Sequence, residues 1–179
     1  MLKKLAIAVV AVLAALVIVI AMQPATFQVQ RAATIAAPPA IVFAHVNDFH
    51  KWEAWSPWAK LDPEMKTTYS GEPAGKGAVY AWTGNSEVGE GRMTILESQP
   101  GERVEIKLEF LKPFAATNIA VLAFKPEGDG TAVTWTMDGN NTFITKAVGL
   151  VMNMDKMIGA DFEKGLATLK AVVEAEAKG

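Results

Sequence analysis

The sequence predicts an α+β protein in which a strongly curved antiparallel sheet of about seven strands wraps around a long C-terminal helix, behind one N-terminal transmembrane helix. Three observations predict this fold class. Residues 5–22 form an unbroken apolar run, residues 65–138 contain a series of short alternating segments, and residues 143–178 carry apolar side chains at helical spacing. Alternation with a period of two indicates half-buried strands, and spacings of three and four indicate a helix with one buried side. The predicted order is β-α-α-β6-α after the first helix.

The N-terminal segment begins with Lys3 and Lys4 and continues with the apolar run Leu5–Met22. As a helix this run is about 27 Å long, close to the roughly 30 Å hydrocarbon core of a bilayer. A cleaved signal peptide and a retained anchor are both open. The length of the run and the lack of a clear cleavage site favour the anchor, and the positive-inside rule leaves the lysines in the cytoplasm. We therefore expect residues 1–24 to be a single-pass inner-membrane anchor (or an uncleaved signal) and residues 25–179 to be one periplasmic or otherwise extracytoplasmic domain.

The folded part is predicted to open with a strand, Thr26–Ala36, whose alternate residues are apolar. Consecutive prolines follow it, and a proline suits the first turn of the predicted helix Pro39–Asp48. Phe49, Trp52 and Trp55 are spaced for a second short helix, which Ser56 and Pro57 end. A further tryptophan at position 58 completes an aromatic cluster whose large rings must be buried somewhere.

Six more strands are predicted between residues 65 and 138. Arg103–Leu111 is the clearest, because apolar Val104 and Ile106 alternate with charged Glu105 and Lys107. One buried and one wet face are typical of an antiparallel sheet. Gly- and Pro-containing turns separate the segments, which favours a meander. The predicted strands are Met65–Ser70, Ala78–Thr83, Val88–Ser98, Arg103–Leu111, Thr117–Lys125 and Thr131–Asp138.

The last element is predicted to be a single long helix from Phe143 to about Lys178 that closes over the sheet. It contains Gly149, Gly159 and Gly165, and each glycine costs a helix about 1 kcal/mol relative to alanine. Close packing or a bend is one interpretation of these glycines, and a helix that shifts over a cavity is the other. The predicted buried side consists of Val151, Met154, Ile158, Phe162, Leu166, Leu169 and Val173.

Composition argues against several functional classes. The net charge is −2 and the pI about 5.7, and no basic cluster follows the N-terminus, so nucleic acid is not an expected partner. The chain has no cysteine, which removes disulfides, thiol catalysis and cysteine-ligated metals. His45 and His50 lack zinc-motif spacing and are expected to face solvent or cap a helix. We expect no metal, no cofactor and no catalytic residue of a recognisable motif.

The aromatic and methionine content instead indicates an apolar ligand pocket, with a solid core as the alternative. Flexible methionines and bulky tryptophans repack around varied ligands. Polar groups expected near such a pocket are Asn85, Glu90, Arg92, Thr117 and Asp138. The predicted ligand-binding residues are Trp52, Trp55, Trp58, Tyr80, Trp82, Met93, Phe110, Phe124, Trp135, Met137, Met154, Ile158 and Phe162.

Several segments resemble a known superfamily. The stretches 31–43, 46–49 and 52–58, followed by 77–82, 91–95, 130–135 and 162–166, are similar to the SRPBCC superfamily of START-like, helix-grip domains, and most similar to its polyketide cyclase/dehydrase-type branch. The resemblance covers roughly residues 27–174. It implies a helix-grip fold and a small hydrophobic ligand, lipid-like in several members, and it supplies no shared catalytic motif.

Three functions follow as hypotheses. The first is a membrane-anchored extracytoplasmic domain that binds a small hydrophobic or amphiphilic ligand between sheet and helix, with entry near Trp52–Trp58. The second is a polyketide cyclase/dehydratase-like enzyme in which Glu90 or Asp138 acts as an acid with a raised pKa. The third is an interaction module with a filled interior and no ligand. Binding is favoured over catalysis.

Overall fold

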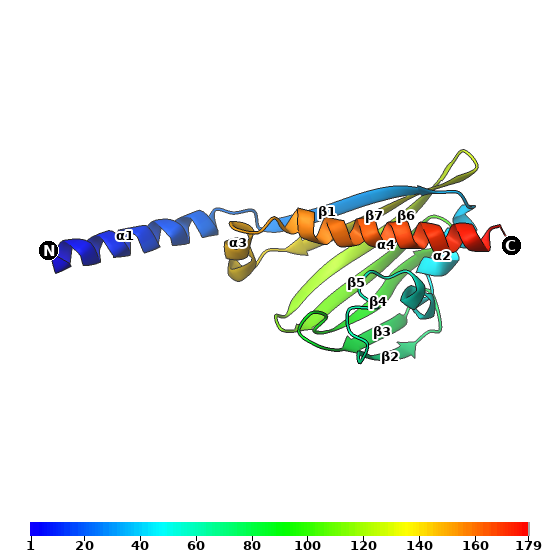
Figure 1. The fold of residues 1–179 in the computed structure, drawn as a ribbon, viewed down its shortest axis with the longest axis horizontal. Coiled ribbons are helices and arrows are strands. Elements are labelled where there is room, and N and C mark those ends of the chain that lie inside the picture. The colour runs from blue at the N-terminus through cyan, green and yellow to red at the C-terminus, as the bar shows by residue number, and fades with distance from the viewer. Residues whose placement is uncertain (179) are drawn as a thin grey trace.

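The computed structural model describes residues 1–178, and its elements follow the predicted order (Figure 1). The predicted α+β class is confirmed, with a seven-stranded sheet, a long C-terminal helix and one N-terminal apolar helix. The elements are α1 (Leu2–Ala21), β1 (Thr26–Ile35), α2 (Pro39–Val46), the 3-10 helix η1 (Phe49–Ala54), β2 (Lys66–Gly71), β3 (Ala78–Thr83), β4 (Glu90–Gln99), β5 (Arg103–Lys112), β6 (Ala116–Glu127), β7 (Gly130–Asn140), α3 (Phe143–Gly149) and α4 (Met154–Glu176).

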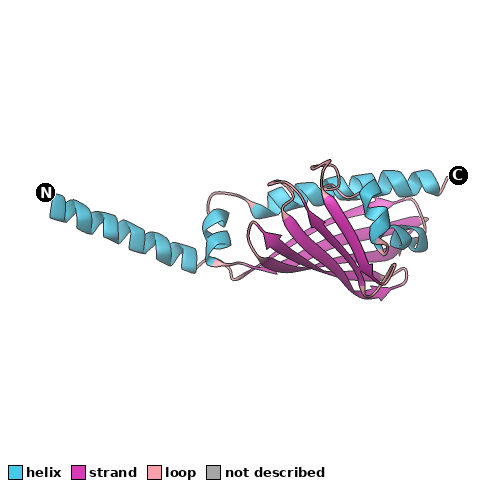
Figure 2. Cartoon of the chain, turned by 90° about the horizontal axis from the view of Figure 1, so that it is seen from below, coloured by secondary structure: helices cyan, strands magenta, loops and turns pink. Residues whose placement is uncertain are grey.

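The sheet is fully antiparallel in the order β1-β7-β6-β5-β4-β3-β2. Strands β2 to β7 form a meander, and β1 joins it beside β7, so the first and second strands of the chain lie at opposite edges. Turn glycines with positive φ, such as Gly71 and Gly101, let the chain reverse between strands. The sheet is strongly curved, and α4 lies along one side of it (Figure 2).

Helices α2 and η1 close the end of the sheet remote from α1. Pro38 and Pro39 open α2, and the Asp48 side chain caps η1 by accepting a hydrogen bond from the His50 backbone amide at 2.9 Å. The indole N–H groups of Trp52 and Trp55 donate to the backbone carbonyls of Val46 and His45 at 2.9 and 3.2 Å. These bonds fold η1 back onto α2 and bury both tryptophans.

The single long helix predicted from Phe143 to Lys178 is wrong, because the helix is broken between Gly149 and Met154. Thr142 caps the first piece, α3, and the Asn153 side chain caps α4 by accepting from the Lys156 amide at 2.9 Å. An asparagine followed by Asp155 in the first turn is a start signal for a new helix. Val151, predicted to be buried, is 85% exposed.

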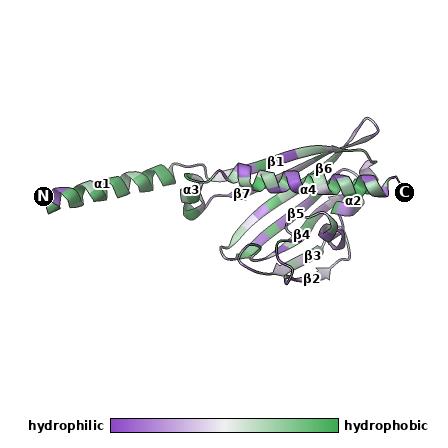
Figure 3. Cartoon of the chain, viewed as in Figure 1, coloured by the Kyte–Doolittle hydropathy of each residue, from purple (hydrophilic) through white to green (hydrophobic). Residues whose placement is uncertain are grey.

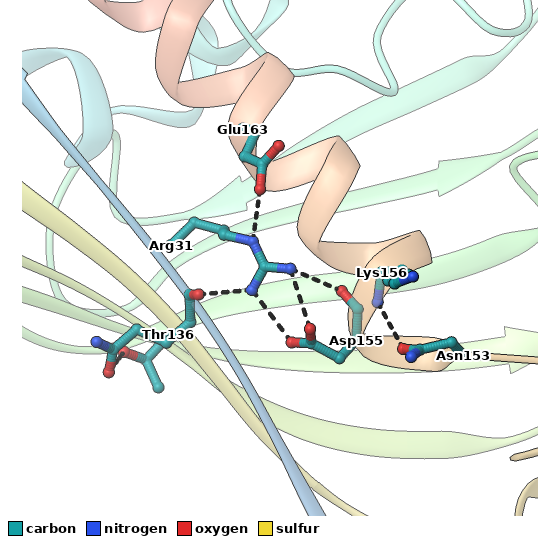
Figure 4. Close-up of polar contacts among 7 residues, drawn as sticks. Arg31, Thr136, Asn153, Asp155, Lys156 and Glu163 are labelled. Atoms are coloured by element: carbon teal, nitrogen blue, oxygen red, sulfur yellow. Dashed lines mark hydrogen bonds and ion pairs between the residues drawn. The ribbon is translucent and has the colours of Figure 1, made fainter.

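Helix α4 is held against β1 by an arginine on the strand's inner face (Figure 4). Arg31 Nε donates to Glu163 Oε1 at 2.7 Å, and its Nη1 lies 3.1 Å from Asp155 Oδ1. The guanidinium occupies the space next to Gly159, where a Cβ would collide with it. Hydrogen bonds from Arg31 hold the pKa of the Asp155 carboxyl below its ordinary 3.8. Close packing was one of the two interpretations of the glycines in the C-terminal helix, and it is confirmed for Gly159.

The other end of α4 is fixed to the same strand. Lys170 Nζ donates to the Thr34 carbonyl at 2.7 Å, and Glu174 accepts from the Ala36 amide at 2.8 Å. The hydrogen bond from Lys170 and that from Ala36 lower the pKa of the Glu174 carboxyl. Between these two attachments the helix buries an apolar stripe made of Phe162, Leu166, Leu169 and Val173.

Helix α1 stands away from the rest of the chain and is hydrophobic along almost its whole length (Figures 1 and 3). It is long and apolar enough to cross a membrane, and its buried residue is Ile20. Its last turn touches α3, where Lys146 Nζ donates to the Ala21 carbonyl at 3.3 Å. The exit of α1 and the start of the C-terminal helical region therefore lie together.

Candidate functional site

A cavity of about 730 Å³ lies between the inner face of the sheet, helix α4 and the segment that links η1 to β2. Ligand pockets for small molecules occupy about 300–1,000 Å³. The cavity is walled mainly by aromatic and aliphatic side chains from β3 to β7, α4 and η1. The interior is therefore not the filled core that the solid-core alternative requires.

Strand register explains why the wall is continuous. One row of directly paired residues crosses the whole sheet and contributes one member from each strand. All members of this row except the glycine line the cavity, since residues in register point to the same face. The row consists of Tyr69, Tyr80, Met93, Leu108, Asn118, Gly139 and Phe27.

The glycine in this row makes room for its two neighbours. A Cβ on Gly139 would collide with Asn118 Oδ1 and with the ring of Phe27. Gly91 has the same function one row away, where a Cβ would overlap the indole of Trp82. These two glycines allow larger side chains from adjacent strands to lie over them and line the cavity.

One part of the cavity wall is aromatic. Trp135 of β7 and Phe162 of α4 stack with centroids 4.1 Å apart, and Trp58 meets both rings edge-on at 5.9 and 6.4 Å. Trp52 also contacts Trp135 edge-on, at 6.3 Å. Offset and edge-on pairs are favourable because the ring edges are positive and the faces negative. This part of the cavity wall is therefore apolar.

A few polar groups face this apolar space. Asn118 is buried on an otherwise apolar inner face and lines the cavity. Burial raises the pKa of Tyr80 to about 12, with smaller contributions from Tyr69 and Glu53, so its phenol is a neutral donor and acceptor at physiological pH. Trp135 carries a buried indole N–H with no acceptor among residues 1–178. These groups can orient the polar end of a ligand.

The rim of the cavity is acidic. Exposed Glu53 and Glu87 and half-buried Asp161 line it, with Lys60 as the cation among them. Asp62 is buried and already occupied, since it accepts from the Asn85 and Glu64 amides at 2.7 and 2.9 Å. Asp62 therefore ties the linker after η1 to the β3–β4 turn, while the remaining carboxylates disfavour an anionic ligand.

Most of the predicted ligand-binding residues line this cavity. Trp55 and Phe124 do not: both are buried, Trp55 under α2 and Phe124 against Phe43 at 6.0 Å. The structure brings the remaining eleven together around one space, which are Trp52, Trp58, Tyr80, Trp82, Met93, Phe110, Trp135, Met137, Met154, Ile158 and Phe162.

The polar residues expected near the pocket lie elsewhere. None of Asn85, Glu90, Arg92, Thr117 and Asp138 lines the cavity within the described chain. Glu90 does not pair with Arg92: it is 2.7 Å from Lys112, while Arg92 contacts Glu109 at 2.8 Å. Asp138 is exposed and accepts from Gln28. Strand parity directs Glu90, Arg92, Thr117 and Asp138 to the outer face, and Asn85 lies in the β3–β4 turn.

Sequence reasoning missed Leu108, Ile106, Asn118 and Tyr69 as lining residues. Leu108 and Ile106 share the parity of Phe110, so alternation alone was enough to find them. Asn118 carried a weaker signal, as a polar residue at an apolar position of a predicted strand. Tyr69 depended on the register between β2 and β3, which the sequence does not specify.

The two histidines have structural partners. His45 was expected to face solvent or cap a helix, but it is buried and its Nε2 lies 2.7 Å from Glu176 Oε2. His50 is exposed and stacks on Tyr69 at 4.1 Å. No group of three or more His, Asp or Glu residues suited to a metal ion occurs among residues 1–178.

Comparison with known proteins agrees with this architecture. Residues 26–174 match the family model described as polyketide cyclase / dehydrase and lipid transport. The chain belongs to this family. The polyketide cyclase/dehydrase family is the branch of the SRPBCC superfamily that the sequence resembles, so that resemblance is confirmed. No curated protein matches the chain.

Solved structures share the fold of this family member at low sequence identity. CV1439 from Chromobacterium violaceum has a TM-score of 0.58 and 19% identity, over 84% of this chain and 99% of that one. TTHA0849 from Thermus thermophilus gives 0.60 and 18%, over 84% and 99%. The di-domain ARO/CYC StfQ from the steffimycin biosynthetic pathway gives 0.61 and 13%, over 87% and 53%. At these identities the likeness concerns the fold.

Proposed function

We propose that this polyketide cyclase/dehydrase family member is a membrane-anchored, extracytoplasmic domain that binds a small hydrophobic or amphiphilic, lipid-like ligand. The observation that carries the proposal is the cavity of about 730 Å³, which one continuous row of side chains from the sheet lines. Its volume suits a small lipid-like molecule. The family description, which includes lipid transport, supports the same ligand class.

Apolar burial provides the driving force for binding. Removing apolar surface from water contributes about 25 cal/mol per Å², and the stacked Trp135 and Phe162 offer a preformed surface for it. Asn118 and Tyr80 then orient the polar end by hydrogen bonding. The acidic rim selects a neutral or cationic polar end over an anionic one.

The N-terminal helix supports the membrane-anchored, extracytoplasmic location in this proposal. In this proposal residues 1–24 are the anchor and residues 25–179 the binding domain. The apolar length of α1 and its position apart from the sheet support this division. Lys3 and Lys4 precede the apolar run, so the positive-inside rule places the domain on the far side of the cytoplasmic membrane.

The alternatives have less support. The cyclase/dehydratase-like enzyme was expected to use Glu90 or Asp138, and neither carboxylate lines the cavity. StfQ is a di-domain ARO/CYC that shares the fold. A shared fold alone identifies no catalytic residue in this chain. The interaction module was expected to have a filled interior, and the cavity argues against it.

Titration of the full-length protein in mild detergent with the neutral dye N-phenyl-1-naphthylamine tests the proposal. Trp52, Trp58, Trp82 and Trp135 line the cavity, so a dye bound there receives energy from them. The proposal predicts saturable energy transfer above the background of empty micelles. A signal that rises only in proportion to the micelle background would contradict ligand binding.

A further inference from the structure

A strongly apolar surface surrounds the break between α3 and α4, which we call the elbow surface (residues 143–152). It exposes Phe143 by 52%, Ile144 by 57%, Val151 by 85% and Met152 by 47%. No residue of α3 is buried, and residues 150–152 are exposed. Contiguous exposed apolar side chains of this size mark an interaction site.

The position of the elbow surface indicates what covers it. Lys146 Nζ bonds to the carbonyl of Ala21 at 3.3 Å, in the last turn of α1. A helix that crosses a bilayer ends at the lipid–water interface, so α3 is held within a few ångströms of that interface. Figure 1 shows α3 between the end of α1 and the sheet, and Figure 3 shows that α1 and α3 are both hydrophobic.

The charge of the segment fits lipid. Between Gly139 and Met154 the sequence contains one charged residue, Lys146, and no acidic one. An apolar segment with a basic residue and without carboxylates is suited to the headgroup region, where anionic lipids attract cations. The acidic residues of α4 begin only at Asp155, which Arg31 engages.

A groove beside this surface borders the ligand cavity. It has a volume of about 440 Å³ and is lined by Gln23 and Pro24 after α1 and by residues of the elbow. The groove and the cavity share four lining residues, Phe27, Asn141, Thr145 and Met154. The groove and the cavity therefore lie next to each other, between the end of α1 and the interior. This position is separate from the entry expected near Trp52–Trp58, where exposed Glu53 and half-buried Trp58 line the cavity.

We infer that the elbow surface lies in the lipid interface as a second membrane contact and that the groove beside it admits ligand directly from the bilayer. The membrane contact requires only that α1 is retained in the membrane, whereas the ligand passage rests on the proposed binding function. The two parts can therefore be tested separately on the full-length protein.

The contact is tested with single-cysteine variants in vesicles of phosphatidylethanolamine and phosphatidylglycerol. The chain has no native cysteine, so Val151→Cys provides one site for an environment-sensitive dye, and Asp129→Cys in the β6–β7 turn provides the matched exposed control. The inference predicts a blue-shifted emission at position 151 that is quenched by shallow acyl-chain nitroxides and unaffected by iodide, with the reverse at position 129.

Other results overturn the contact. Iodide quenching at position 151 equal to that at position 129 would mean that the elbow surface faces water. Protection at position 151 from both quenchers would mean that a second copy or another part of the protein covers it. Either outcome leaves the binding proposal standing if N-phenyl-1-naphthylamine still binds.

The passage is tested by the rate of dye uptake from the same vesicles. Val151→Glu places a charge on the elbow surface and is expected to slow uptake roughly tenfold without changing equilibrium binding, whereas Val151→Leu keeps the wild-type rate. Equal rates in the two variants would overturn entry at the elbow. Absence of dye binding in the wild type, with a lipid-embedded label at position 151, would refute the passage and the proposed function while keeping the membrane contact.

Discussion

The indole of Trp135 on β7 and the ring of Phe162 on α4 stack almost parallel, with centroids 4.1 Å apart and an angle of 6° between their planes. This pair connects the sheet to the helix in the wall of the cavity. Next to it, Gly165 lets the helix approach, because a Cβ there would lie 2.9 Å from Trp135 and 3.1 Å from Pro57. The aromatic pair therefore adds to the polar attachments between α4 and β1 that hold the helix over the cavity.

Trp135→Leu and Phe162→Leu are each expected to lower the free energy of unfolding by about 1–3 kcal/mol through lost packing. A double-mutant cycle should show a coupling of about 0.5–1.5 kcal/mol, as for other aromatic pairs. The dye should also bind about tenfold more weakly, a loss of about 1.4 kcal/mol. Unfolding curves and dye titrations check this. Lost stability with unchanged dye affinity would assign the pair to a solid core.

Filling the cavity should prevent binding without unfolding the protein. Ala120 is buried on the inner face of β6 and lines the cavity, whereas Ala123 lies on the outer face of the same strand. Ala120→Phe is expected to weaken dye binding by about tenfold or more, and Ala123→Phe should bind like the wild type. Equal affinities in the two variants would show that the dye binds elsewhere.

Acid should loosen α4 through its contact with Arg31. The pKa of Asp155 lies below its ordinary 3.8 because Arg31 donates hydrogen bonds to it. A carboxyl whose pKa is lower in the folded than in the unfolded state stabilises the fold above the unfolded value, and this contribution is lost as pH falls through the folded value. The melting temperature of the wild type should therefore fall below pH 4 towards that of Arg31→Gln, which should show a smaller decline. Parallel melting curves for both proteins across this range would rule out the contact as a source of stability.

Two glycines of α4 should resist replacement although alanine is the better helix former by about 1 kcal/mol. Gly159→Ala and Gly165→Ala are expected to lower the melting temperature, since the added Cβ meets Arg31 in the first and Trp135 in the second. Gly149 has no atom within 4 Å of its Cβ position, so Gly149→Ala is the matched control and should be neutral or slightly stabilising. Stabilisation at position 159 would mean that the helix has room to shift.

Ligand charge should matter at the rim. Glu53, Glu87 and Asp161 surround the opening with a single lysine among them, and carboxylates repel an anionic headgroup. Dodecanol is therefore expected to displace the dye at lower concentration than dodecanoate, and dodecylamine should do so at least as well as the alcohol. Preference for dodecanoate in this competition would contradict the assigned role of the rim.

The periodic elements were predictable because their patterns are local. Alternation in β5 and helical spacing from Met154 to Val173 each follow from one buried face, so their positions agree with the structure to within a few residues. The break at residues 150–153 was missed because the apolar spacing continues through it, and the Asn153 cap was outweighed by that pattern. Helix starts depend on a single side chain, whereas helix faces depend on many.

The cavity was less predictable than the fold. Which aromatic residues line the cavity depends on long-range pairing. Trp55 and Phe124 are aromatic like Trp58 and Phe110, yet they pack against α2. The row that contains Asn118 and Gly139 emerges only from the register of each strand pair across the sheet. The assignment of polar residues to the inner face failed for Glu90 and Asp138 because a shift of one residue reverses the face.

The measurement that tests the central claim most directly is native mass spectrometry of the full-length protein, released from mild detergent, beside its Ala120→Phe variant. The account predicts that the wild type carries an additional molecule of defined mass, neutral or cationic in its polar end, and that Ala120→Phe has lost it. Identical adducts on both proteins, or a wild type that stays free of adducts when incubated with dodecanol, would contradict a ligand-binding cavity between the sheet and α4.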